Sequence, residues 1–291
     1  MSEPYSPLRY PGGKAKITDF LIRVMAANGL REPHYVEPYA GGAGAALRLL
    51  FEEYVEAVTI NDADPRIQCF WRAVTEYNDG FLALLDKIEI SVEEWRLQRT
   101  IYERCDVDNV LELGFAVFFL NRTTRSGIIH NGGPIGGFDQ TGNYKIDARF
   151  NRSQLSRRIQ RIGIYADRID VYGDDGLSLL QKVDSDERSA ATSFVYLDPP
   201  YYVKGAELYL NRFTHEQHRR LAEYLSTPKR FPWVMTYDNV EAIRNLYSEC
   251  PRFSFNLSYS AYERRAGEEL LIHPPSLLVT PEAKQSLPLA A

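Results

Sequence analysis

Short apolar segments that end in loops of glycine, proline, asparagine or aspartate recur along the chain. Residues 34–36, 57–60 and 194–197 are three such segments, each rich in β-branched or aromatic residues. Segments of this length and composition predict buried strands. Helical periodicity follows the first two, over residues 45–54 and 65–77. Alternating strands and helices predict an α/β fold with a parallel sheet, whose functional loops follow the carboxyl ends of the strands.

The alternation breaks down between about residues 68 and 151. Helical patterns over residues 81–88, 92–104 and 110–120 lead there into a loop rich in Gly, Asn and Thr, residues 121–143. A loop of that length is unusual as a simple connection in a compact sheet domain. We therefore expect an inserted helical domain with a binding loop. The predicted order is the first part of a sheet domain, the helical domain and the second part of the sheet domain, at residues 1–67, 68–151 and 152–291.

The alternation resumes after the inserted domain. An amphipathic run over residues 154–165 precedes a short strand at 169–172, and a helical pattern over 214–226 precedes a strand at 233–237. The residues after about 280 lack such a pattern, so we expect a loosely held tail.

Composition narrows the class of protein. The chain is 44% hydrophobic and 25% charged, which does not match the composition of a disordered protein. No apolar run approaches the roughly 18 residues that span a bilayer, and residues 1–14 lack the apolar core of a secretory signal, so we expect a cytoplasmic protein. Cys69, Cys105 and Cys250 lie too far apart for a paired-ligand zinc pattern. We expect buried thiols.

Charge is unevenly distributed along the chain. The net charge is −5, but residues 119–168 hold nine basic and three acidic residues, so this stretch carries +6 and the remainder −11. Such asymmetry predicts one face or domain that meets a polyanion. A solvated helix face around residues 152–161 explains the basic residues equally well.

A glycine cluster follows the first predicted strand. Gly41, Gly42 and Gly44 would let the backbone approach a ligand closely, and Asp62 follows the next strand. A carboxylate in that place can accept hydrogen bonds from ribose hydroxyls. Leu47 stands where a third glycine of the dinucleotide motif would lie, which argues against a pyrophosphate site. An ordinary turn would also explain the glycines.

The sequence Asp-Pro-Pro-Tyr-Tyr at residues 198–202 is the most specific indication of a functional site. Two prolines remove two backbone donors and stiffen the loop. The Asp198 carboxylate and the Pro199 carbonyl can then act as fixed acceptors beside the aromatic ring of Tyr201. This arrangement suits a planar amino group such as the exocyclic amine of a nucleobase. The alternative is a rigid surface turn.

Four blocks resemble, in order, those of the Dam-type (D12 class, α group) DNA adenine-N6 methyltransferases. Residues 8–14 resemble the N-terminal cofactor block, residues 36–39 with the glycines the methionine-side loop, residues 61–62 the ribose acid, and residues 198–201 the catalytic D-P-P-Y. Asn-Arg-Thr at 121–123 resembles the opening of the target-recognition loop, and residues 265–272 the closing segment. The resemblance implies a Rossmann-like S-adenosylmethionine-dependent methyltransferase sheet with an inserted, mostly helical target-recognition domain.

The same resemblance implies roles for individual residues. Asp198 and Pro199 would engage the target amine, and Tyr201 would stack on an adenine flipped out of the duplex. The residues implied to bind the cofactor are Tyr10, Lys14, Glu37, Gly41, Asp62, Asp175 and Asp198. The residues expected to bind DNA are Asn121, Arg122, Arg125, His130, Arg157 and Arg158.

The recognition loop departs from the family pattern. Ser-Gly-Ile-Ile-His at residues 126–130 stands where the family often has N-G-x-x-R, so we do not expect GATC specificity. Arg125 could read a guanine or hold a phosphate. The glycines at 132–133 and 136–137 predict a loop that becomes ordered only on DNA.

The predicted function is site-specific transfer of a methyl group from S-adenosylmethionine to a flipped adenine in double-stranded DNA, with no metal. Methylation of cytosine N4 or of RNA adenine, and a non-catalytic DNA-binding module that holds S-adenosylmethionine, are the alternatives. We expect a nucleoid-associated monomer or weak dimer without a membrane partner. A cognate restriction endonuclease that acts on the same sequence is a further candidate partner.

Overall fold

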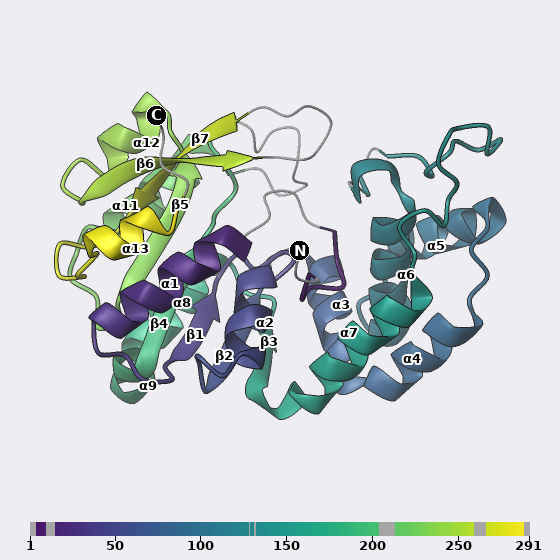
Figure 1. Cartoon of the computed structure of the whole chain (residues 1–291), viewed down its shortest axis with the longest axis horizontal. Helices are drawn as coiled ribbons and strands as arrows, with labels where there is room; N and C mark the ends of the chain where they lie inside the picture. Colours follow the sequence, from purple (N-terminus) through teal and green to yellow (C-terminus); the bar gives the residue numbers. More distant parts are fainter. Residues whose placement is uncertain are drawn as a thin grey trace. The chain divides into compact units, whose positions relative to one another are not determined.

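The computed structural model describes residues 4–9, 15–127, 129–130, 132–203, 213–258 and 266–287. Its strands form a seven-stranded sheet in the order β3-β2-β1-β4-β5-β7-β6 (Figure 1). Strands β2, β1, β4 and β5 run parallel, whereas β7 is antiparallel to β5 and β6. The strands are β1 (His34–Glu37), β2 (Ala57–Asn61), β3 (Ile169–Tyr172), β4 (Ser193–Leu197), β5 (Trp233–Asp238), β6 (Arg252–Ser258) and β7 (Ala266–Ile272). The predicted α/β fold with a mostly parallel sheet is confirmed.

The chain divides into two compact units. The helical unit comprises residues up to Pro11 together with Ala63–Gly173, and the sheet unit comprises Gly12–Asp62 and Asp174–Ala291. The predicted helical domain ended at residue 151, whereas the helical unit continues to Gly173. The continuation follows from the packing of the helix at 152–164, whose apolar face is buried and whose Ile159 carbonyl accepts a 2.8 Å hydrogen bond from Asn78 Nδ2.

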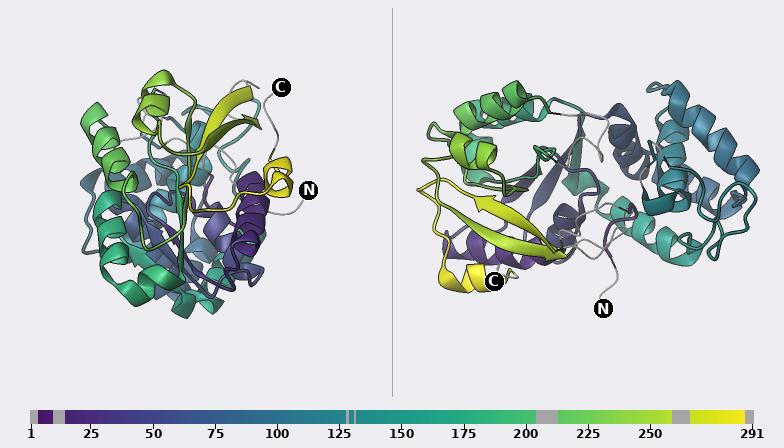
Figure 2. Two further views of the ribbon diagram at one scale, coloured as in Figure 1. Left: turned by 90° about the vertical axis from the view of Figure 1, so that its left-hand side faces the viewer. Right: turned by 90° about the horizontal axis from the view of Figure 1, so that it is seen from above.

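The sheet unit has a core of apolar residues from both strands and helices. Strand β4 is buried throughout, and its Val195 and Leu197 pack with Trp233 and Met235 of β5. Continuous burial of this kind is typical of parallel strands covered on both faces. Figure 2 shows α1 and α13 on one side of the sheet and α8 and α11 on the other. The helices of this unit are α1 (Ala15–Ala27), α2 (Gly44–Phe51), α8 (Gly176–Ser185), α9 (Glu187–Thr192), α11 (His215–Leu225), α12 (Glu241–Leu246) and α13 (Pro281–Gln285).

The helical unit is built around one helix that is buried on nearly all sides. The helix α6 (Val110–Thr123) contributes Phe115 and Phe118, which contact Phe81 at ring-centroid distances of 5.1 and 5.3 Å. The other elements of the unit are α3 (Pro65–Glu76), α4 (Asn78–Lys87), α5 (Val92–Arg104), α7 (Arg152–Ile164), η1 (Arg125–Gly127) and η2 (Ala166–Arg168). Residues 121–123, expected to begin a loop, form the last turn of α6.

The expectation of a loosely held tail after residue 280 is wrong for the described residues. Helix α13 begins at Pro281, where the preceding Thr280 accepts a 3.2 Å hydrogen bond from the Ala283 amide. Ala283 and Leu287 are buried. The segment is too short to show helical periodicity, but its Thr-Pro start is a helix-initiation signal. No helix in the described part of the chain is long and apolar enough to cross a membrane.

Gly114 allows α3 and α6 to approach closely. A Cβ atom at this position would lie 2.6 Å from both the Ala73 Cβ and the Cys69 carbonyl oxygen. We predict that Gly114→Ala lowers the free energy of unfolding by about 1–2 kcal/mol, because the steric cost exceeds the gain of about 1 kcal/mol in helix propensity. Thermal and urea unfolding would measure the change.

Gly80→Ala is the matched control in the same unit. Its added Cβ would meet only the end of the Leu111 side chain, at 3.0 Å, and that side chain can move. We expect unchanged or slightly higher stability. Equal effects of the two substitutions would contradict the steric explanation.

Candidate active site

Asp198 directly follows β4 and is anchored from the neighbouring strand. Its Oδ1 accepts a 2.8 Å hydrogen bond from Thr236 Oγ1 on β5. The same Thr236 oxygen lies 2.8 Å from the Tyr196 hydroxyl. Because a threonine hydroxyl carries one hydrogen, which goes to Asp198, Tyr196 must donate to Thr236. This relay of two hydroxyl groups fixes the orientation of the Asp198 carboxylate.

The loop beyond Asp198 is held by two acidic residues. Pro199 is buried, and Tyr201 is only 7% exposed. The Tyr201 hydroxyl donates a hydrogen bond to Glu269 Oε1, and burial, with neighbouring carboxylates, raises the pKa of Tyr201 well above its ordinary value. The backbone amide of Tyr202 donates to Asp238 Oδ1 at 2.9 Å. The stacking of Tyr201 on a base stays a prediction.

The predicted glycine loop and ribose acid lie together. The Gly41 amide donates a 3.0 Å hydrogen bond to Asp62 Oδ2. Gly41 and Ala43 both adopt positive φ, at 47° and 44°, so the loop turns sharply before α2. A Cβ atom added to Gly44 would have no neighbour within 4 Å among the described atoms, which leaves open space at this loop.

Glu37 lies beneath the glycine loop. Its side chain is buried and accepts hydrogen bonds from the Tyr35 hydroxyl at 2.9 Å and the Ala46 amide at 3.2 Å. These contacts join the end of β1 to the start of α2. A contribution of Glu37 to cofactor binding stays a prediction, and these bonds would let it act by fixing the loop.

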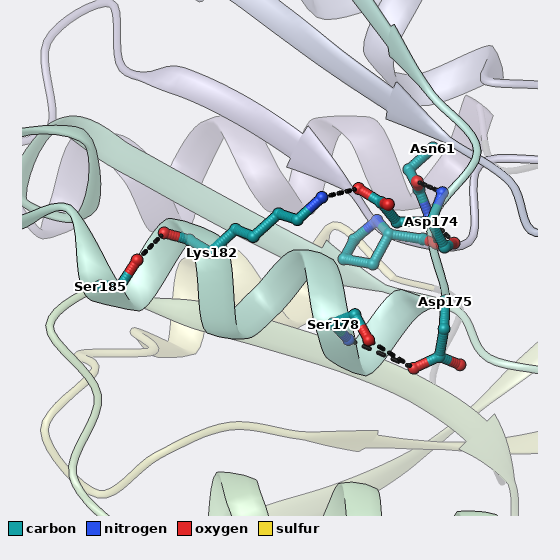
Figure 3. Close-up of polar contacts among 7 residues, drawn as sticks. Asn61, Asp174, Asp175, Ser178, Lys182 and Ser185 are labelled. Carbon is teal, nitrogen blue, oxygen red and sulfur yellow. Dashed lines mark hydrogen bonds and ion pairs between the residues drawn. The ribbon is translucent and has the colours of Figure 1, made fainter.

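A buried carboxamide connects three loops at this edge of the sheet. Asn61 Nδ2 donates to the carbonyls of Pro38 at 2.8 Å and Asp174 at 3.0 Å, and its Oδ1 accepts from the Asp174 amide at 2.9 Å. Figure 3 shows the Asn61 side chain against Asp174, with Asp175 following Asp174 in the chain. Asp175 caps α8 by accepting a 3.2 Å hydrogen bond from the Ser178 amide. Asn61 thus fixes the segments that carry Asp62 and Asp175. This role of Asn61 was not predicted from the sequence, although an asparagine at the end of an apolar strand is a visible signal.

The strand register brings the D-P-P-Y loop and the glycine loop to one edge of the sheet. In the parallel β1–β4 pair, Val36 lies opposite Val195, and in the β1–β2 pair Glu37 lies opposite Ile60. The chain therefore leaves β1, β2 and β4 at the same end of the sheet. Two of the implied cofactor residues, Tyr10 and Lys14, lie outside the described residues.

In the helical unit, Asn121 supports an arginine. Asn121 is 4% exposed, and its carboxamide bonds the backbone amide and carbonyl of Arg9 at 2.6 and 2.9 Å and the Gly127 carbonyl at 3.2 Å. Arg9 Nη1 in turn donates to the Thr124 carbonyl at 3.0 Å. The DNA-binding role predicted for Asn121 would therefore act through the position of Arg9.

Four arginines gather near this point. Arg122 Nε donates to the Arg149 carbonyl at 2.8 Å, and Arg158 Nη1 to the Ser6 carbonyl at 3.4 Å. Burial, with the positive charges of Arg9, Arg158 and Arg149, lowers the pKa of Arg122 to about 9. Within the described part of the chain, Arg9, Arg122 and Arg149 form no ion pair with an acid. Arg9 and Arg149 were not predicted from the sequence as DNA-binding residues, because only folding brings them close to Arg122. A polyanion would relieve the repulsion among these charges.

The remaining predicted DNA contacts are exposed. Arg125 lies in η1, His130 in the following loop and Arg157 on α7. The main chain at His130 is held by Arg99, whose Nη2 donates to the His130 carbonyl at 3.0 Å. The structure therefore presents these three side chains at the surface of the helical unit.

The sheet and its carboxyl edge define the class of protein. A mostly parallel sheet whose antiparallel strand β7 lies between β5 and β6, with glycine and acidic loops after β1 and β2, is the fold of S-adenosylmethionine-dependent methyltransferases. Within that class, the family model of the D12 class N6 adenine-specific DNA methyltransferases matches residues 10–265. The chain belongs to this family and is an adenine-specific DNA methyltransferase. The resemblance predicted from sequence motifs is confirmed. A comparison with curated proteins finds no match.

The Asn61 bonds give a testable consequence. We predict that Asn61→Leu lowers the free energy of unfolding by about 2–4 kcal/mol, because it leaves buried backbone groups without partners. The affinity for S-adenosylmethionine should also fall at least about tenfold, since the loops carrying Asp62 and Asp175 lose their connection. Thermal unfolding and isothermal titration calorimetry would measure the two effects.

Lys182→Ala, in α8, is the control, because this side chain also contacts Asp174. Lys182 forms an exposed ion pair with Asp174 at 2.7 Å. Such surface pairs contribute about 0–1 kcal/mol, so little change is expected. Wild-type stability and affinity in the Asn61 variant would refute its connecting role.

Proposed function

We propose that this enzyme methylates N6 of an adenine that has been flipped out of double-stranded DNA. The observation that carries the proposal is the anchored Asp198 carboxylate, held by Thr236 at the same sheet edge as the Gly41–Asp62 pair. Chemistry on a base that remains stacked in the duplex is sterically blocked, which supports flipping.

The glycine edge of the sheet fits the donor S-adenosylmethionine. The open space at Gly44 accommodates a ligand close to the backbone, and the carboxylates of Asp62 and Asp175 suit hydroxyl and amino groups. S-Adenosylmethionine supplies an electrophilic methyl group on a sulfonium. We propose that Gly41, Asp62 and Asp175 hold it, together with Tyr10 and Lys14.

The D-P-P-Y loop suits the acceptor amine. The Asp198 carboxylate and the Pro199 carbonyl would accept the two hydrogens of the adenine N6 amine and direct its lone pair toward the methyl carbon. As the nitrogen–carbon bond forms, the bond between the methyl carbon and the donor sulfur would break and S-adenosylhomocysteine would leave as a neutral thioether. One N–H proton would pass to Asp198 and then to solvent. The Tyr201 ring would stack on the base. The adenine specificity of the family favours this amine over cytosine N4.

The helical unit is proposed as the target-recognition domain. Arg9, Arg122 and Arg149 would contact phosphates, since neighbouring positive charges, which form no ion pair with an acid among the described residues, favour a polyanion. The exposed side chains of Arg125 and His130 are candidates for base contacts. Mapping methylated adenines after expression in a methylation-free host would give the recognition sequence, and protection of that sequence from a co-encoded endonuclease would identify a restriction partner.

Replacement of Asp198 tests the catalytic assignment. We predict that Asp198→Ala reduces methyl transfer at least about 100-fold, because the amine loses its fixed acceptor. Asp198→Asn should be similarly impaired while keeping an acceptor for Thr236. Transfer of labelled methyl groups to unmethylated DNA would be measured, with circular dichroism to establish folding and exposed Glu187→Ala as the control. Near-normal turnover in both variants would refute the assignment.

Removal of basic residues tests DNA binding. We predict that Arg157→Ala with Arg158→Ala weakens binding of all duplexes alike and reduces the slope of log affinity against log salt by up to about 2. Fluorescence anisotropy across a salt series would measure it. Arg219→Ala, whose side chain pairs with Glu216 in the sheet unit, is the control. An altered target preference with an unchanged slope would contradict phosphate contact.

A further inference from the structure

Two buried carboxylates face each other across an antiparallel strand pair. Asp238 ends β5 and lies directly opposite Glu269 of β7 in the strand register. Asp238 is 5% exposed and Glu269 is 1% exposed. Residues directly opposite in a sheet point to the same face. Burial of two acids side by side is unfavourable unless hydrogen-bond donors meet them.

The donors come from the loop after Asp198. The amides of Tyr202 and Val203 donate to the two carboxylate oxygens of Asp238, each at 2.9 Å. The Tyr201 hydroxyl donates to Glu269 Oε1. Pro199 and Pro200 have no amide hydrogen, so the loop cannot be anchored through its backbone donors until Tyr201. The two acids accept hydrogen bonds from the three residues that follow the prolines: from the side-chain hydroxyl of Tyr201 and from the backbone amides of Tyr202 and Val203.

Strand β5 holds both ends of the segment 198–203. Thr236 and Asp238 are two residues apart and therefore lie on one face of the strand. Thr236 bonds Asp198, the first residue of the segment, and Asp238 bonds Tyr202 and Val203, its last two residues. Glu269 extends this support to the aromatic side chain from the adjacent strand.

We propose that Asp238 and Glu269 form an acidic clamp that positions Tyr201 and its loop for methyl transfer. The proposal rests on the proposed function of Asp198 and Tyr201. Both clamp residues are positioning residues, because each would act through the hydrogen bonds that it accepts from residues 201–203. The clamp gives the C-terminal strand β7 a part in the active site.

The clamp acts on the orientation of one ring. The Tyr201 phenol keeps its proton, because its buried hydroxyl has a pKa well above the ordinary value. Its single hydrogen is therefore always available to Glu269. Asp238 fixes the backbone directly after Tyr201, and Glu269 fixes the Tyr201 hydroxyl. The Tyr201 ring is therefore held at both ends. Misplacement of a positioning group by about 1 Å can cost about 100-fold in rate.

The test compares variants that remove or keep the contact. Glu269→Ala and Tyr201→Phe each abolish the hydrogen bond, and each should lower kcat about 10- to 100-fold with little change in KM for S-adenosylmethionine. The double variant should be no slower than the worse single one, because both lose the same contact. Glu269→Gln keeps an acceptor oxygen and should restore kcat to within about threefold.

Glu268→Gln is the matched control, because Glu268 is the exposed neighbour of Glu269 on β7. A base-flipping readout, the fluorescence of 2-aminopurine at the target position, should change in Glu269→Ala and not in the control. If Glu269→Ala does not fold, Tyr201→Phe against Glu269→Gln still makes the comparison. Wild-type kcat in Tyr201→Phe, or additive losses in the double variant, would overturn the clamp.

The same assay separates the clamp from the proposed function. Total labelled methyl transfer measures the clamp, whereas digestion of the DNA and analysis of the modified base identifies the product. If the wild-type enzyme makes a product other than N6-methyladenine, the proposed function is refuted, but the ratios of variant to wild-type kcat still test the clamp. If the wild-type product is N6-methyladenine and the kcat of Glu269→Ala and Tyr201→Phe is unchanged, the clamp alone is refuted.

Discussion

The hydrogen bond from Thr236 to Asp198 is the constraint on which the active site depends. A loop with two successive prolines has few donors of its own, so its geometry must be set by neighbouring strands. Strand β5 provides that support because its alternate residues share one face. The Tyr196 hydroxyl completes the relay to Thr236. A rigid acceptor is useful for catalysis only when its direction is fixed before the substrate arrives.

The loops that Asn61 contacts are also held by a side chain from a neighbouring strand, in this case a carboxamide. Parallel strands end in loops whose backbone groups are partly buried and need partners. The Asn61 carboxamide meets two of these loops with three hydrogen bonds and is itself fully buried. Side chains on β2 and β5 thus organise loops that are distant in sequence.

Local patterns predicted the parallel strands well, because β1, β2, β4 and β5 are continuous apolar runs. The hairpin of β6 and β7 was not predicted, since its register depends on pairing across the sheet. For the same reason the role of Glu269 was invisible: only the alignment with Asp238 brings it to Tyr201. Among predicted site residues, Gly41 and Asp62 meet as expected, whereas Asn121 is enclosed by the main chain.

The arginines around Arg122 hold their positive charges close together at a cost in stability. Burial and mutual repulsion lower the pKa of Arg122 to about 9, so the free protein holds these charges at a cost. Main-chain carbonyls, which accept hydrogen bonds from Arg9 and Arg122, fix the directions of these two side chains without neutralising them. Carboxylates in place of these carbonyls would stabilise the helical unit but would weaken its positive electrostatic potential. The net charge of −5 then conceals a local positive site, because the compensating acids lie elsewhere in the chain.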